Sequence, residues 1–300
     1  MSVRIVEVGP RDGLQNESTP IPTEIKIAFI RNLVDAGLTE IEATSFVSPK
    51  WVPQLGDAAE LWPQLPKGAT YSALVPNQRG LERALELKVD RIALFTATSD
   101  DFTMKNINMS VEESLQVFSE VANAYRSSIP DGWIRGYVST AFECPYAGRM
   151  PADLAINVAE RLLTMGCDEV SFGDTIGVAV PSEVRHLTKL AQNALGLEKV
   201  NFHFHDTRGT AIANVAEAYE LGVRSFDSSA AGLGGCPYAV GAGGNLATDD
   251  LVYFLERSGV STGINSSKLA SASLPILESL GRAPVAKAQQ AVLAESRRTQ

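Results

Sequence analysis

The sequence predicts a single (β/α)8 barrel over residues 1–300, with a C-terminal helical extension at roughly residues 265–300. Short β-branched runs alternate with longer helical patterns along the chain, which is typical of a parallel sheet. Eight such runs are present, and 300 residues suffice for one barrel of about 250 residues plus an extension. Polar and small residues crowd the positions directly after the runs, where barrels of this class carry their active sites.

The expected strands are the eight apolar runs, and the expected helices lie between and after them. The strands cover residues 3–8, 40–43, 70–74, 91–95, 134–139, 169–172, 200–204 and 225–227. The helices cover residues 23–36, 77–86, 111–127, 152–165, 181–194, 210–221, 247–257 and 266–280, and residues 295–300 are expected to be frayed. In the first helix Ile27, Ile30 and Leu33 fall at helical spacing, and a glycine follows as a C-terminal cap.

An open, doubly wound sheet is the alternative to a closed barrel. Eight repeated units favour closure. No Gly-x-Gly-x-x-Gly motif follows the first expected strand, which disfavours the dinucleotide-binding form of the open sheet.

Composition excludes several classes of partner. The formal net charge of -9 and the lack of a basic patch argue against nucleic acid, because phosphate binding needs clustered cations. No apolar stretch reaches the roughly 18 residues of a membrane span, and the N-terminus lacks the apolar core of a signal peptide. Three scattered cysteines do not form a disulfide framework. A cytoplasmic protein is the expectation.

Two of the three histidines form the most specific local motif, His203-Phe204-His205. Because successive strand residues point to opposite faces, both imidazoles are expected to enter the barrel mouth, while Phe204 points away. Two neutral imidazoles together with oxygen ligands suit a divalent ion. The alternative is a hydrogen-bonded pair of core histidines.

Arg11 and Asp12 follow the first expected strand, in a turn flanked by Gly9 and Gly13. The first and last strands of a closed barrel are neighbours and the seventh is close, so Asp12 is expected to reach an ion held by the histidine pair. Arg11 would then stabilise a developing oxyanion. A surface turn with a salt bridge is the alternative.

Two further carboxylates end expected strands. Glu42 ends the second strand, where an unpaired buried charge is costly, so Arg11 is its natural partner. Asp174 follows the sixth strand and is a candidate acid–base or supporting group. For both residues, a purely structural ion pair is the alternative.

Two thiols are candidates for chemistry at the mouth. Cys236 stands in a glycine-rich stretch, and Cys144 follows the fifth expected strand. A thiol at either place is suited to proton transfer or nucleophilic attack, and an inert loop residue is the alternative. The residues alone do not rank the two.

Six segments together carry a family resemblance that spans about residues 3–265. They read EVGPRDGLQNE, IEATSFVSPKWVPQ, NINMSVEES, GDTIG, HFHDT and AGLGGCPYAVGAGGNLATDDLVY. In order and spacing this chain resembles the 3-hydroxy-3-methylglutaryl-CoA lyase family. That family belongs to the metal-dependent barrels related to isopropylmalate and homocitrate synthases.

The resemblance implies a metal site and a set of catalytic residues. The implied ligands of Mg2+ or Mn2+ are Asp12, His203, His205 and Asn245. The implied catalytic set is Arg11 as enolate stabiliser, Glu42 as its partner, Asp174 as acid–base residue and Cys236 as the thiol, chosen over Cys144. Arg11, Gln15 and Arg208 are the expected substrate-binding residues. An acyl-CoA substrate, a homodimer and a place in leucine degradation and ketone-body formation are also implied.

The implied reaction is a retro-Claisen cleavage into acetyl-CoA and acetoacetate. His203 or Asp174 would take the proton of the substrate's C3 hydroxyl, Arg11 would hold the enolate oxygen, and Cys236 would protonate the carbon. The chain departs from the family after HFHDT, where Arg208-Gly209-Thr210 replaces the usual Tyr-Gly-Gln. Arg208 either pairs with a substrate carboxylate or is a surface charge. The alternatives for the reaction are therefore a related branched 3-hydroxyacyl-CoA or citramalyl-CoA as substrate, a condensing enzyme of the same superfamily, or a barrel kept as a scaffold.

Overall fold

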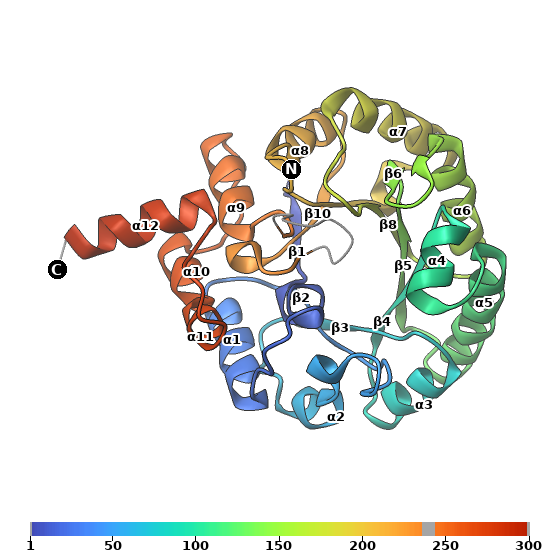
Figure 1. Ribbon diagram of the computed structural model, residues 1–300, viewed down its shortest axis with the longest axis horizontal. Coiled ribbons are helices and arrows are strands. Elements are labelled where there is room, and N and C mark those ends of the chain that lie inside the picture. The colour runs from blue at the N-terminus through green and yellow to red at the C-terminus, as the bar shows by residue number, and fades with distance from the viewer. Residues whose placement is uncertain (1, 236–243, 299–300) are drawn as a thin grey trace.

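Eight parallel strands close into a barrel in the computed structural model, which describes residues 2–235 and 244–298 (Figure 1). Around the barrel they run β1 (Arg4–Glu7), β10 (Ser225–Ser228), β9 (Val200–Phe204), β8 (Glu169–Asp174), β5 (Trp133–Ser139), β4 (Arg91–Ala97), β3 (Thr70–Leu74) and β2 (Glu40–Ser45), which pairs with β1 again. The predicted fold class is confirmed, and the open sheet is excluded. All eight expected strands are present, each within two residues of its expected bounds.

Helices surround the barrel as the periodicity predicts (Figure 1). They are α1 (Thr23–Asp35), α3 (Gln78–Glu86), α5 (Val111–Ser128), α6 (Ala152–Thr164), α7 (Pro181–Ala194), α8 (Ala211–Glu220) and α9 (Thr248–Arg257). In the described part of the chain, none of the helices has both the length and the apolarity that crossing a membrane requires.

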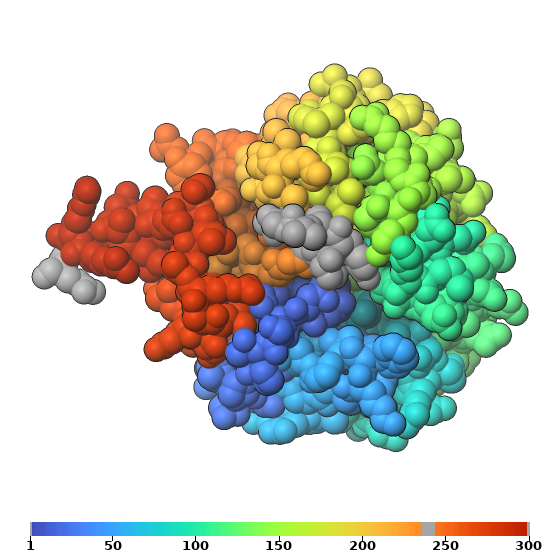
Figure 2. All heavy atoms as spheres, in the orientation of Figure 1, coloured from blue at the N-terminus to red at the C-terminus, as the bar shows by residue number. Residues whose placement is uncertain are grey.

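The C-terminal region differs from expectation in two ways. The single helix expected over residues 266–280 is wrong: α10 (Ser266–Ala272) and α11 (Leu274–Ser279) are separate helices. Pro275 lies in the first turn of α11, where its missing N–H leaves no hydrogen bond broken, whereas it would break a continuous helix. The fraying expected from residue 295 is also wrong as far as residue 298, because α12 (Lys287–Arg298) covers those residues. Figures 1 and 2 show α12 extending from one side of the barrel.

Several short elements were not expected. They are α2 (Ala58–Leu61), α4 (Asp100–Ile107), a hairpin of β6 (Glu143–Cys144) and β7 (Gly148–Arg149), and brief 3-10 turns. In α4 the side chain of Ser99 caps the N-terminus, and Asn108 ends the helix in the left-handed conformation. Elements of this length present too few turns for periodicity to identify them.

The strand β9 sorts its side chains onto two faces. Phe202 and Phe204 are buried on the outer face, where their rings stack with centroids 5.1 Å apart, and Phe204 also contacts Phe142. His203 lies on the opposite face, inside the barrel. The expectation that Phe204 points away from the histidine pair agrees with this packing.

Glu7 joins the turn after β1 to the turn after β10. Its side chain is fully buried, and Oε1 accepts the backbone N–H groups of Gly9 (2.8 Å) and Ala230 (2.9 Å). Oε2 accepts the hydroxyl of Thr248 at 2.6 Å. Burial outweighs these hydrogen bonds and raises the pKa of Glu7 from 4.5 to about 7.

We predict that Glu7→Gln changes the pH dependence of stability. The native state binds the Glu7 proton more tightly than the unfolded state, so this contribution is complete below about pH 4.5 and is lost as the pH rises to about 7. Glutamine retains an acceptor for both backbone N–H groups and does not titrate. Between about pH 5 and pH 8 the unfolding free energy of the wild type should therefore fall relative to that of the variant, by on the order of 1–3 kcal/mol.

Urea unfolding of both proteins at the two pH values measures this difference. Glu82→Gln, on the exposed face of α3, is the matched control and should show the same difference from wild type at both pH values. The prediction would be contradicted if the difference in unfolding free energy between Glu7→Gln and the wild type were the same at about pH 5 and at about pH 8.

Candidate active site

The histidine pair and Asp12 meet at the carboxyl end of the strands. His203 Nε2 lies 3.2 Å from His205 Nε2 and 3.9 Å from Asp12 Oδ2. One potential ligand atom from each of the three residues lies within 4.8 Å of the others. The structure therefore brings together the three side chains that sequence reasoning placed around one ion.

A tight π-helical turn, Gly9–Gly13, holds Asp12 at this place. The backbone N–H groups of Arg11, Asp12 and Gly13 all donate to the carbonyl of Val8, at 2.8–3.2 Å. Gly9 is needed because a Cβ there would lie 2.5 Å from Glu7 Oε1. The turn fixes Asp12 by backbone hydrogen bonds, independently of any ligand.

Asn245 lies beside the same three residues. Its backbone pairs with that of His205 in an isolated antiparallel bridge, and its Nδ2 donates to Asp12 Oδ2 (2.9 Å) and to the carbonyl of Leu233 (3.1 Å). Its buried Oδ1 has no hydrogen-bond partner among the described residues. An orphaned buried acceptor is costly in a protein interior, and a cation would satisfy it.

Burial and neighbouring charges shift the pKa values of the cluster in different directions. Burial and the neighbouring His203 lower the pKa of His205 to about 4, which keeps that imidazole neutral. Burial alone would raise the pKa of Asp12, but the charges of Arg11 and the histidines outweigh it and hold the pKa below its ordinary value. At His203 burial would lower the pKa, and Asp227 and Asp12 raise it instead. Two imidazoles and a carboxylate within 4.8 Å of one another, with the unpartnered amide oxygen of Asn245 beside them, fit a divalent cation by the chemistry of their donor atoms.

Arg11 borders the metal cluster and is almost fully buried. Its Nε donates to Glu42, the expected partner, and its Nη1 donates to Asp12 Oδ1 at 2.7 Å. Gln15 Oε1 accepts from the same Nη1 at 3.3 Å. Burial opposes the charge on Arg11, but Glu42 and Asp12 outweigh it and raise the pKa of the guanidinium. Arg11 thus remains a cation at the edge of the proposed ion site.

Asp174 makes hydrogen bonds to its own loop. Its Oδ1 accepts the N–H of Val178 at 2.9 Å and its Oδ2 accepts the N–H of Ala179 at 3.1 Å. Burial nevertheless raises the pKa of Asp174 to about 6. The carboxyl group therefore shapes the loop after β8, and its role as an acid–base residue stays a prediction.

Arg208 is exposed and donates from Nη1 to the carbonyls of Ile176 (2.8 Å) and Gly177 (3.0 Å). It thus touches the same loop that Asp174 shapes. Thr210, the other departure from the family pattern, directly precedes α8. Binding of a substrate carboxylate by Arg208 stays a prediction.

The two candidate thiols differ in what the structure describes. Cys236 lies outside the described residues, so its role stays a prediction. Cys144 is buried in β6, where its sulfur accepts the N–H of Tyr146 at 3.4 Å. A buried thiol of this kind is generally inert.

Asp227 is the functional candidate that sequence reasoning missed. This fully buried residue accepts from His203 Nδ1 at 3.2 Å and from Arg135 Nη1 at 2.6 Å. A histidine that binds a metal commonly donates its other ring nitrogen to a carboxylate. The available signal was the period-two placement of Ser225 and Asp227 inside the eighth strand, which puts the carboxylate in the barrel interior.

Known proteins resemble this chain over nearly its whole length. A family model described as HMGL-like matches residues 2–276. The mitochondrial hydroxymethylglutaryl-CoA lyase of Bos taurus is 47% identical, over 96% of this chain and 89% of the relative. The crystal structure of hydroxymethylglutaryl-CoA lyase from Pseudomonas aeruginosa superposes with a TM-score of 0.94 at 44% identity, covering 98% of both chains.

A further solved structure is that of an HMG-CoA lyase from Acinetobacter baumannii in complex with coenzyme A and 3-methylmalate. It has a TM-score of 0.91 at 35% identity, covering 97% of this chain and 95% of that one. From the extent of the family match and the identity to these relatives, this chain belongs to the HMGL-like family.

Proposed function

We propose that this protein is a carbon–carbon lyase that cleaves 3-hydroxy-3-methylglutaryl-CoA into acetyl-CoA and acetoacetate. The observation that carries the proposal is the cluster of Asp12, His203 and His205 beside Arg11, in a chain that is 44–48% identical to proteins named hydroxymethylglutaryl-CoA lyase. The complex of a relative with coenzyme A supports an acyl-CoA substrate. Such a lyase fits leucine degradation and ketone-body formation.

Asp12, His203, His205 and Asn245 would hold the metal, which we propose to be Mg2+ or Mn2+. Bound there, a divalent cation supplies Lewis-acid polarisation of the substrate's hydroxyl and carboxylate oxygens. The protein supplies the fixed geometry: the turn after β1 holds Asp12, and a backbone bridge joins His205 to Asn245.

Arg11 would stabilise the enolate oxygen of the departing acetyl-CoA. The guanidinium is already oriented by Glu42 and Asp12, so little reorganisation is needed when negative charge develops on the substrate. Gln15, which accepts a hydrogen bond from Arg11, lies where a substrate group could replace that contact.

The proposed reaction needs two proton transfers. His203 or Asp174 would take the proton of the C3 hydroxyl, and Cys236 would protonate the new carbanion. The pKa of about 6 at Asp174 is suited to a base near neutral pH.

The exposed guanidinium of Arg208 favours a second candidate within the same chemistry. A cation at this place is suited to a carboxylate in a different position at C3, as in citramalyl-CoA, whose single carboxylate is attached directly to C3, or in a related branched 3-hydroxyacyl-CoA. Product analysis after adding the acyl-CoA substrate would also separate cleavage from condensation.

We also propose that the protein forms a homodimer and lies in the cytoplasm. Sedimentation of the purified protein tests the first of these proposals.

We predict that Arg11→Met lowers turnover of 3-hydroxy-3-methylglutaryl-CoA by about 10²–10³-fold, because one oxyanion donor contributes roughly this much. Mn2+ should still bind, because Arg11 is not among the proposed ligands, and loss of its hydrogen bond to Asp12 Oδ1 should change the Kd for Mn2+ by no more than about tenfold. Release of acetoacetate and a Mn2+ titration measure the two quantities. Arg79→Met, on the exposed face of α3, is the control. Near-normal turnover of Arg11→Met would exclude the assigned role.

We predict that Arg208→Tyr, which restores the residue usual in the family, shifts selectivity among branched 3-hydroxyacyl-CoA thioesters. If Arg208 pairs with a substrate carboxylate, substrates that carry the matching carboxylate should lose about tenfold or more in kcat/KM relative to the others. A panel of thioesters assayed with Mg2+ gives the ratios. Unchanged ratios would make Arg208 a surface charge that only supports the loop after β8.

A further inference from the structure

Asp227 accepts hydrogen bonds from three strands inside the barrel. Its Oδ1 accepts from Arg135 Nη1 at 2.6 Å. Its Oδ2 accepts from the hydroxyl of Ser171 at 3.1 Å and from His203 Nδ1 at 3.2 Å. All four side chains are buried, so the carboxylate is oriented by partners on β5, β8 and β9.

This arrangement determines the tautomer of His203. Asp227 forms an ion pair with the guanidinium of Arg135 at 2.6 Å, and both side chains are buried. An ionised carboxylate only accepts, so Nδ1 of His203 carries a proton in this hydrogen bond. Nε2, which faces Asp12 and His205, is then the nitrogen that offers a lone pair to a cation.

Arg135 is also connected to Arg11 through hydrogen bonds of Tyr137 and Glu42. Its Nη1 donates to the phenol oxygen of Tyr137 at 3.3 Å, and the Tyr137 hydroxyl donates to Glu42 Oε2. Glu42 Oε1 accepts from Nε of Arg11. Donors and acceptors alternate correctly along this chain of hydrogen bonds. One guanidinium thus stands at the branch point between the histidine ligand and the oxyanion-binding arginine.

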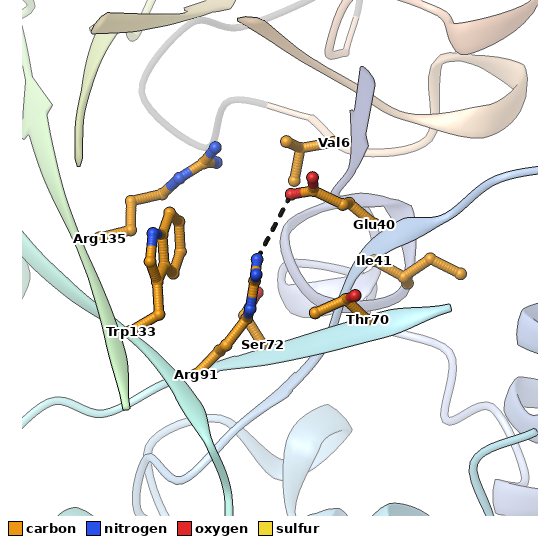
Figure 3. Close-up of a pocket in the computed structure, with 8 residues that line it drawn as sticks. All are labelled: Val6, Glu40, Ile41, Thr70, Ser72, Arg91, Trp133 and Arg135. Atoms are coloured by element: carbon orange, nitrogen blue, oxygen red, sulfur yellow. Dashed lines mark ion pairs between the residues drawn. The ribbon is translucent and has the colours of Figure 1, made fainter. Parts of the chain in front are cut away.

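The floor of the barrel holds Arg135 in place. Its Nε donates to Glu169 Oε1 at 2.7 Å, and its guanidinium lies 5.7 Å from the centroid of the Trp133 ring. Figure 3 shows Trp133 with Arg135 and Arg91 beside it, around a cavity of about 10 Å³. Nη1 of Arg91 in turn lies 3.7 Å from Oε2 of Glu40. The floor leaves room for about one water, so Arg135 has little space to move.

We propose that Arg135 is a positioning residue for the lyase reaction, acting on His203 through Asp227 and on Arg11 through Tyr137 and Glu42. The inference rests on the proposed function, because it assigns a support for that same site. Arg135 touches neither the metal ligands nor any substrate-binding residue directly. Its effect is transmitted by the two hydrogen-bonded branches, which separate at the guanidinium.

An arginine is needed at this branch point because its planar fork donates in several fixed directions at once. Here the directions are Glu169, Asp227 and Tyr137. A lysine ammonium keeps the charge that the two buried carboxylates require but does not reproduce that geometry. Arg135→Lys therefore separates positioning from mere charge neutralisation.

Three variants test the branches separately, each assayed for Mn2+ affinity on metal-stripped protein and for turnover. Asp227→Asn should raise the Kd for Mn2+ by about 10–100-fold, as loss of a carboxylate behind a histidine ligand does. Tyr137→Phe should lower kcat roughly tenfold, the effect of one lost hydrogen bond, and leave the Mn2+ Kd within about twofold. Arg135→Lys should do both, with a roughly tenfold change in each quantity.

Lys26→Arg is the matched control, because Lys26 is also a buried cation, paired with Asp57 in contacts outside the barrel interior. It should change neither quantity beyond about twofold. Wild-type Mn2+ affinity retained in both Asp227→Asn and Arg135→Lys would overturn the proposal, as would a loss of Mn2+ affinity in Tyr137→Phe equal to that in Asp227→Asn. If Arg135→Lys does not fold, the contrast between the other two variants decides. Wild-type protein that binds no Mn2+ would instead refute the proposed metal site, and this inference with it.

Discussion

Inside the barrel, the carboxylate of Asp227 and the guanidinium of Arg135 form a buried ion pair with 2.6 Å between the bonded atoms. Taking these charges out of water is costly unless every donor and acceptor is satisfied. Ser171 and His203 donate to the other oxygen of Asp227, and Glu169 accepts from Nε of Arg135. Barrels of this type usually fill this layer with branched apolar side chains. The interior residues of β5, β8, β9 and β10 are therefore mutually constrained.

At the mouth of the barrel, too, fixed partners hold the side chains in position. Backbone geometry and buried partners fix each residue of the proposed ligand cluster, so its side chains need little rearrangement to meet. Asp12 is held by a turn whose amides converge on the carbonyl of Val8, and Asn245 by its bridge to His205. His203 is held from below by Asp227. Sites supported in this way bind a cation at little cost in reorganisation.

The fold and the central motif could be predicted because both are local in sequence. Eight apolar runs, each followed by polar residues, give the barrel, and the period of two places His203 and His205 on one face. Asn245 was predicted only through the family resemblance. The period of two places Asp227 in the barrel interior, but one sequence contains no signal for the side chains on other strands with which it pairs. Arg135 is the clearest case: within β5 an arginine looks like an exposed residue until Glu169 and Asp227 are known to face it.

Residues inside the barrel and residues at the rim of its mouth differ in how easily they can be replaced, and this difference bears on substrate choice. In the interior, a change at Arg135, Tyr137 or Glu42 leaves a buried charge or donor without its partner, which is destabilising. Arg208 is exposed, and its donation to the carbonyls of Ile176 and Gly177 can be replaced by water at little cost. If Arg208 contacts the substrate as we propose, a change at this position alters the acyl group that binds and leaves the proposed metal and oxyanion positions unchanged. We therefore expect the departure from the family pattern at Arg208 to affect selectivity and to leave the proposed bond-breaking residues in place.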